Sequence, residues 1–296
     1  QSGGEAIRSA LEDEDVDVEL LPPGDAGPDR DSDFDAGIIV HEYAHGISNR
    51  LSGRTTLSCH GSAEQQGEGW SDFYGLMFTL TPQVCEAPRG IGTYASFQHS
   101  TGPGIRRFPY SPDMGINPFT FGDTNDEANS APHGVGSIWA TMLWDMSCNL
   151  MDRYGVDADI TSRQGGNGIA MSLVTEGLKL GGCDPTFVQS RNNILAADAA
   201  FVAAGNGYDS NACLIWRTFA RRGLGESASS GVTTSRLDQV EAFDAPELLL
   251  FVRHYIKHRG LDEFRRRLVC LPCHHIGQIL VFDLQLTGKT CDMFEP

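Results

Sequence analysis

The feature that most constrains this chain is a histidine pair within residues 37–46, which read Gly-Ile-Ile-Val-His-Glu-Tyr-Ala-His-Gly. Residues four apart lie on one face of an α-helix, so His41 and His45 can bind one metal ion. Glu42 lies beside them and can reach a water molecule on that metal. Two imidazole ligands and a carboxylate that acts as general base are typical of zinc sites. The alternative is a surface helix with two solvated histidines.

A second helical segment supplies carboxylates that favour the metal site. Glu68 and Asp72 are four residues apart and share a helix face. A catalytic zinc ion takes three protein ligands and keeps one open position, so we expect Glu68 to be the third ligand. We expect Asp72 to accept a hydrogen bond from the outer nitrogen of a ligating histidine and so to fix its tautomer. The alternative is that both carboxylates belong to a polar helix face.

The longer motif, in which a third histidine follows the pair, is excluded by the residues present. That motif needs glycine and histidine at the positions where Ser48 and Leu51 stand. The third ligand must therefore come from elsewhere in the chain, and Glu68 is the obvious candidate.

The charge and the apolar pattern exclude several classes of protein. A formal net charge of −17 makes nucleic acid and anionic membranes poor partners. The longest apolar run, residues 248–252, is far shorter than a membrane span. Twelve acidic residues against two arginines give residues 1–35 a charge of −10. We expect residues 1–30 to be an acidic, poorly ordered leader, with calcium binding by its aspartates as the alternative.

Apolar periodicity and capping residues predict a chain that is mainly helical. The first helix carries the histidine pair, begins near Asp33 or Asp35 and ends at Ser52. The second begins at a capping box of Ser62 and Gln65 and ends before residue 82. Four more are expected over residues 134–154, 169–180, 184–204 and 210–222, with Asp184 as the cap of the third. The last three helices are expected to bury Leu173, Val174, Leu178, Phe187, Ile194, Leu195, Phe201, Leu214, Ile215 and Phe219.

The segment between the second helix and residue 130 is rich in glycine, proline and asparagine, so we expect an irregular surface loop. An arginine of its Arg106-Arg107 pair could contact a peptide carbonyl, and a solvated side chain is the alternative. Eight cysteines favour an oxidising compartment. Cys183 and Cys213 flank a helical pair that a disulfide between them would join, and two buried thiols are the alternative.

Two motifs taken together resemble the fungalysin metallopeptidases, which are secreted, thermolysin-like zinc endopeptidases. The motifs are residues 41–51, His-Glu-Tyr-Ala-His-Gly-Ile-Ser-Asn-Arg-Leu, and residues 67–73, Gly-Glu-Gly-Trp-Ser-Asp-Phe. The resemblance extends over residues 28–247. It implies a fold that is mainly α within an α+β gluzincin (thermolysin-like) architecture, in which a helical C-terminal half packs against a sheet-containing half.

The resemblance also implies a chemistry. One catalytic Zn²⁺ would be held by His41, His45 and Glu68, with Glu42 as general base. His133, at the entry to the helix expected over residues 134–154, would stabilise the oxyanion of the tetrahedral intermediate; a local hydrogen bond is the alternative. The substrates would be proteins or peptides, the protein would be extracellular, and an inhibitory propeptide would lie upstream. The need for calcium is left open.

The resemblance fails towards both ends of the chain. The family's sheet half precedes the zinc helix, and only 40 residues precede His41 here, so we expect that half to be largely missing. We expect residues 31–246 to form a metallopeptidase catalytic region, truncated at its N-terminal side and with apolar surface exposed where the sheet would pack. Residues 247–296 are expected to be a basic tail, in which Cys270 and Cys273 could bind zinc. The alternative function is a truncated, inactive remnant that binds zinc or peptide without efficient cleavage.

Overall fold

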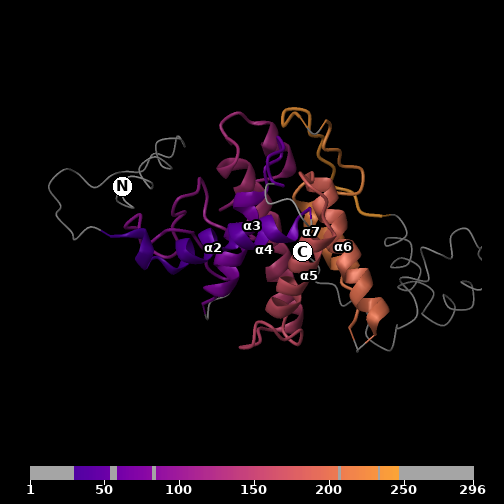
Figure 1. Ribbon diagram of the computed structural model, residues 1–296, viewed down its shortest axis with the longest axis horizontal. Helices are drawn as coiled ribbons and strands as arrows, with labels where there is room; N and C mark the ends of the chain where they lie inside the picture. Colours follow the sequence, from indigo (N-terminus) through magenta and orange to yellow (C-terminus); the bar gives the residue numbers. More distant parts are fainter. Residues whose placement is uncertain (1–29, 54–58, 82–84, 206–207, 233, 247–296) are drawn as a thin grey trace, which may run out of the picture.

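The computed structural model describes residues 30–53, 59–81, 85–205, 208–232 and 234–246. Within these ranges there is no strand beyond isolated bridges, so the prediction of a mainly helical chain is confirmed for the described residues. The predictions for residues 1–29 and 247–296, including the acidic leader and the cysteine pair of the tail, lie outside them. The elements are η1 (Ser32–Phe34), α2 (Ala36–Leu51), α3 (Gly67–Phe78), η2 (Phe121–Asn125), α4 (His133–Tyr154), α5 (Gly166–Leu180), α6 (Phe187–Ala204) and α7 (Ala212–Arg221) (Figure 1).

Asp35 starts α2, as its sequence predicts. The Asp35 Oδ1 atom accepts hydrogen bonds from the backbone N–H groups of Gly37 and Ile38, which have no partner inside the helix. The other oxygen accepts from the N–H groups of Tyr94 and Ala95. One carboxylate therefore begins the helix with the histidine pair and attaches it to a distant loop.

The predicted start of the second helix at Ser62 is wrong, because α3 begins at Gly67. The expected capping box does not form. Glu64, inside that box, instead turns inward and accepts a hydrogen bond from the N–H of Phe187, the first residue of α6. A long-range contact thus overrides the local capping pattern.

The long helix α4 is the centre of the fold. It packs against α3, α5 and α7, while α2 packs on α3 and α5 packs on α6. Figure 1 shows α2, in indigo, at the left of the view and α5 and α6 beside each other to the right. The Trp139 ring lies 5.0 Å from the rings of Trp70 and Phe187 and 5.7 Å from that of Phe219, measured between centroids. Because each fully buried ring contributes on the order of 2–3 kcal/mol, this aromatic cluster anchors the core.

The predicted core positions of α5, α6 and α7 are confirmed. Those fully buried are Leu173, Val174, Leu178, Phe187, Ile194, Ile215 and Phe219, and those packed against the core and partly buried are Leu195, Phe201 and Leu214.

Two glycines let α3 and α4 approach at backbone distance. A methyl group on Gly69 would collide with the carbonyl oxygen of Gly136, and one on Gly136 would collide with the Cβ of Glu68. Only glycine fits at this crossing. It places the first turn of α3, which carries Glu68, against the first turn of α4, which begins at His133.

The predicted cap of α6 is also wrong. Thr186, not Asp184, caps the helix: its hydroxyl accepts from the N–H of Gln189, whose side chain accepts from the N–H of Thr186. Asp184 instead adopts a positive φ of 53° and accepts a hydrogen bond from the N–H of Gly61.

The cysteine pairing also differs from the prediction, because it joins segments that lie far apart in the sequence. Cys183 is bonded to Cys59, and Cys85 is bonded to Cys148, so the expected disulfide between Cys183 and Cys213 is wrong. The chain after α2 returns to the α5–α6 connection, where the Cys59 carbonyl also accepts from the N–H of Asp184. Cys59 lies 124 positions from Cys183, a separation at which no local pattern indicates a pair.

Apolar side chains are exposed just before α2 and along its first half. Phe34 and Tyr43 are each 76% exposed, and Ile39 is 52% exposed. The sequence predicts exposed apolar surface where the sheet half of the family would pack. That a missing sheet is the cause of the exposure at α2 stays a prediction. None of the described helices is both long and apolar enough to cross a membrane.

Candidate metal centre

Three side chains from two helices converge on one point. The Nε2 atoms of His41 and His45, on successive turns of α2, lie 3.1 Å apart. From the first turn of α3, Glu68 places Oε2 3.1 Å from His41 Nε2 and Oε1 3.4 Å from His45 Nε2. With bonds of about 2.0–2.1 Å, ligand atoms of a tetrahedral zinc ion are about 3.3 Å apart. The three groups therefore fit Zn²⁺ in chemistry and in spacing.

Asp72 orients the first of these histidines. Its Oδ1 lies 2.6 Å from His41 Nδ1, which directs the other ring nitrogen towards Glu68. Burial opposes a charged His41 ring, but the carboxylates of Asp72 and Glu68 outweigh it and raise the pKa of His41 to about 9. Surroundings that hold a proton so strongly also favour a cation between His41 and Glu68.

Arg106 and Tyr110 complete the network around Asp72. The sequence offered Arg106 only as a contact for a peptide carbonyl or as a solvated side chain, and it did not indicate Tyr110. Arg106 Nε donates to Asp72 Oδ2 at 2.7 Å, while its Nη2 donates to Asp72 Oδ1 at 3.0 Å and to Glu68 Oε2 at 3.1 Å. The Tyr110 hydroxyl donates to Asp72 Oδ2. Arg106 is 2% exposed and Tyr110 is fully buried, so the prediction of a surface loop is wrong at these two residues.

The buried arginine also sets the charge of the carboxylates. Burial would raise the pKa of Asp72, but Arg106 and His41 hold it well below its usual range. Burial would likewise raise the pKa of Glu68, but hydrogen bonds from His41 and His45 and the charge of Arg106 hold it far below that range. Both groups are therefore carboxylates at neutral pH. The signal that could have found Arg106 is this requirement of a buried, ionised Asp72 for a cation.

The other two predicted residues lie beside this cluster. Glu42, next to His41 on α2, is exposed, and within the described residues no hydrogen bond or ion pair engages its carboxylate. His133, the first residue of α4, places Nε2 3.6 Å from Glu68 Oε1. Burial lowers the pKa of His133, which the Glu68 carboxylate offsets only in part. Burial therefore favours the neutral form of the His133 imidazole at neutral pH, and this form can donate one hydrogen bond.

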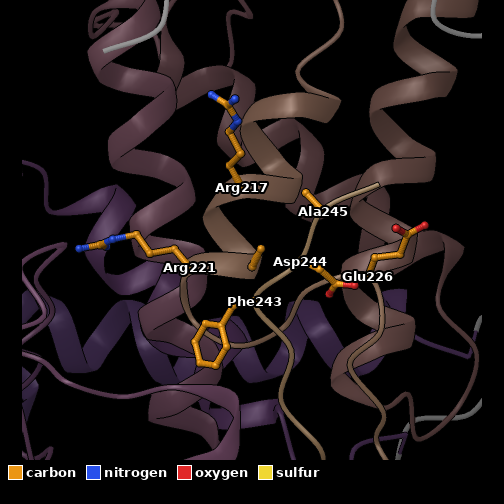
Figure 2. Close-up of a pocket in the computed structure, with 7 residues that line it drawn as sticks. Arg217, Arg221, Glu226, Phe243, Asp244 and Ala245 are labelled. Carbon is orange, nitrogen blue, oxygen red and sulfur yellow. The ribbon is translucent and has the colours of Figure 1, made fainter. Parts of the chain in front are cut away.

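A separate hollow lies against α7, between the side chains of Arg217 and Arg221 and the chain near Phe243 (Figure 2). Two of its polar side chains already have partners: Arg221 donates to Asp145 and to the Pro112 carbonyl, and Asp244 accepts from Ser227. The hollow shares no residue with the three-ligand cluster.

Comparison with known proteins agrees with the geometry. A sequence model of the family described as Fungalysin metallopeptidase matches residues 23–228. Extracellular metalloproteinase 2 of Trichophyton tonsurans is 39% identical over 231 residues, which are 75% of this chain and 34% of that protein. Extracellular metalloproteinase MEP of Leptosphaeria maculans is 39% identical over 233 residues, 74% of this chain and 34% of that protein. The chain spans about a third of the length of the curated relatives it matches. From the extent of these matches, the chain belongs to the fungalysin metallopeptidase family.

Proposed function

We propose that this chain carries the zinc site of a secreted metalloendopeptidase that hydrolyses proteins or peptides. The observation that carries the proposal is the convergence of His41, His45 and Glu68 at the spacing of tetrahedral zinc ligands. Membership of a family whose relatives are named extracellular metalloproteinases supports it. The same relatives favour a peptidase over an inactive remnant that binds zinc or peptide.

The three ligands would hold one Zn²⁺, with Asp72 orienting His41 and Arg106 balancing the carboxylates. A zinc ion in such a site lowers the pKa of a bound water towards 7 and polarises a carbonyl group. Glu42, one residue from the first ligand, takes the proton of the attacking water and passes it to the leaving amine. The neutral His133 donates a hydrogen bond to the oxyanion that develops on the scissile carbonyl.

The wider setting follows the family. We place the helices in a gluzincin (thermolysin-like) fold, with residues 31–246 as the catalytic region. Two disulfides suit an oxidising, extracellular compartment. An inhibitory propeptide upstream belongs to the same proposal.

The test separates zinc binding from chemistry. Glu42→Gln should keep one equivalent of zinc by elemental analysis and lose on the order of a hundredfold or more in peptide hydrolysis. Glu176→Gln, on the surface of α5 beside Lys179, is the matched control and should match the parent. A Glu42→Gln variant within a few-fold of an active parent would contradict the role of Glu42. A parent that binds zinc and cleaves no peptide would support the inactive remnant instead.

A further inference from the structure

Arg236, in the segment that follows α7, contacts four backbone carbonyl groups, one in η2 and three in the loop that follows it. Its Nη1 donates to the carbonyls of Thr124 at 3.1 Å, Asp126 at 3.0 Å and Asn129 at 3.1 Å. Its Nη2 donates to that of Glu127 at 3.5 Å. Four carbonyl dipoles that point at one place repel each other, so the guanidinium charge stabilises this loop conformation.

This loop leads directly into the candidate metal centre. Residues 126–132 form no helix, and α4 begins immediately after them at His133. Asn129 is 2% exposed, and its side-chain amide donates to the Asp123 carbonyl at 2.9 Å. A methyl group on Gly134 would lie 2.7 Å from the carbonyl carbon of Asn129, so loop and helix are packed without a gap. The position of the Asn129 backbone therefore fixes the first turn of α4.

The segment that carries Arg236 is itself held in place by a second pair of hydrogen bonds. The Asn125 side-chain amide donates to the Gln239 carbonyl at 2.8 Å, and the N–H of Gln239 donates to Asn125 Oδ1 at 3.0 Å. This reciprocal pair attaches the segment of Arg236 to η2. The guanidinium thus has a fixed position relative to the carbonyls that it meets.

We propose that Arg236 is a positioning residue for His133. The guanidinium fixes the carbonyls of residues 124–129, these fix Asn129 against Gly134, and the first turn of α4 then keeps the His133 ring near Glu68. The hydrogen bonds of Arg236 go to the carbonyls of residues 124–129 and not to the three proposed metal ligands, which lie on α2 and α3. The inference rests on the proposed function, because the action of His133 on the oxyanion is part of that proposal.

The test compares Arg236→Ala with Arg153→Ala in the zinc-loaded full chain. Arg153 is an exposed arginine that stacks on Tyr154 at the far end of α4, so the control loses the same charge. We expect Arg236→Ala to lower kcat about 10- to 100-fold, as small misplacements of catalytic groups do, with unchanged zinc content and KM within about twofold. Millimolar guanidinium chloride should restore part of kcat, and equal sodium chloride should not. Loss of zinc, or an unchanged kcat, would overturn the proposal.

A double variant distinguishes positioning from general destabilisation. If Arg236 acts through His133, adding Arg236→Ala to His133→Ala should lower kcat by less than about threefold. A full additional loss would overturn the proposal. Hydrogen exchange is the readout that needs no activity: amides of residues 126–136 should exchange faster in Arg236→Ala, and those of α2 should not change. A parent that cleaves no peptide contradicts the proposed function alone, and unchanged exchange over residues 126–136 overturns the role of Arg236.

Discussion

Glu64 gives the stability of this chain a pH dependence that follows from its surroundings. The side chain is 1% exposed, and its Oε2 accepts from the N–H of Phe187 at 2.8 Å and from the Ser230 hydroxyl at 3.2 Å. Its Oε1 accepts from Gln239 Nε2 at 3.4 Å. Burial raises the pKa of Glu64 to about 7, because these hydrogen bonds offset only part of the desolvation cost of the charge.

The size of the effect follows from the two pKa values. In the unfolded chain Glu64 has the ordinary pKa of 4.5, and in the folded chain its pKa is about 7. Between these two pH values the folded chain holds a proton on Glu64 that the unfolded chain has lost. The stabilising contribution is therefore fully present below pH 4.5 and is lost as the pH rises through 7. The interval corresponds to about 3 kcal/mol in total, at about 1.4 kcal/mol for each pH unit. About 2 kcal/mol of this falls between pH 5.5 and 8.

The assay is urea unfolding of the parent and of Glu64→Gln between pH 5.5 and 8, which stays above the sequence pI of about 4.8. Glutamine keeps one carbonyl oxygen for the N–H of Phe187, and its amide can donate to Gln239 Oε1, which is buried without a partner. The other titrating groups are common to both proteins. As the pH rises from 5.5 to 8, the free energy of unfolding of Glu64→Gln should therefore rise by about 2 kcal/mol relative to that of the parent. Glu176→Gln should run parallel to the parent. Parallel curves for Glu64→Gln and the parent would refute the reasoning.

The ligands, the helix crossing and the buried arginine give three more expected outcomes. His45→Ala should lose tight zinc binding, and full zinc occupancy by elemental analysis would contradict its assignment as a ligand. Gly136→Ala should force α3 and α4 apart and cost about 1–3 kcal/mol, whereas Gly182→Ala, whose added methyl meets no atom within 4 Å, should cost little; equal melting temperatures would show that the crossing tolerates a side chain. Arg106→Ala should cost about 3–5 kcal/mol in urea unfolding because it leaves Asp72 buried without its cation, and a loss below about 1 kcal/mol would contradict that dependence.

The parts of the fold and site that could be predicted are those set by short spacings. The helices follow from apolar periodicity, although the predicted caps of α3 and α6 are wrong, and Asp35 begins α2 because the chemistry of that cap is local. His41, His45, Glu68 and Asp72 could be placed together because four-residue spacings fix one face of each helix. The structure brings these four side chains within hydrogen-bonding or ligand distance.

The rest depends on contacts between residues far apart in the sequence. Arg106 lies 34 positions from Asp72 in an irregular segment, where nothing local separates a buried arginine from a solvated one. Glu64 leaves its expected helix for a partner 123 positions away, and Cys59 pairs across a similar distance. In each case the energy of a buried polar or covalent contact exceeds the small preference of a local motif.

The carboxylate of Asp35 has a mechanical consequence. One oxygen holds the first turn of α2 and the other holds residues 94 and 95, in the same irregular segment that carries Arg106. His41 lies six residues further along the helix, about 9 Å at 1.5 Å per residue. The segment therefore contacts the candidate metal centre at two places. It binds Asp35 at the start of α2, and through Arg106 it binds Asp72 and Glu68 on α3. Since α2 is a stiff rod over this length, loosening the Asp35 contacts would move His41 and His45 together relative to Glu68 on α3.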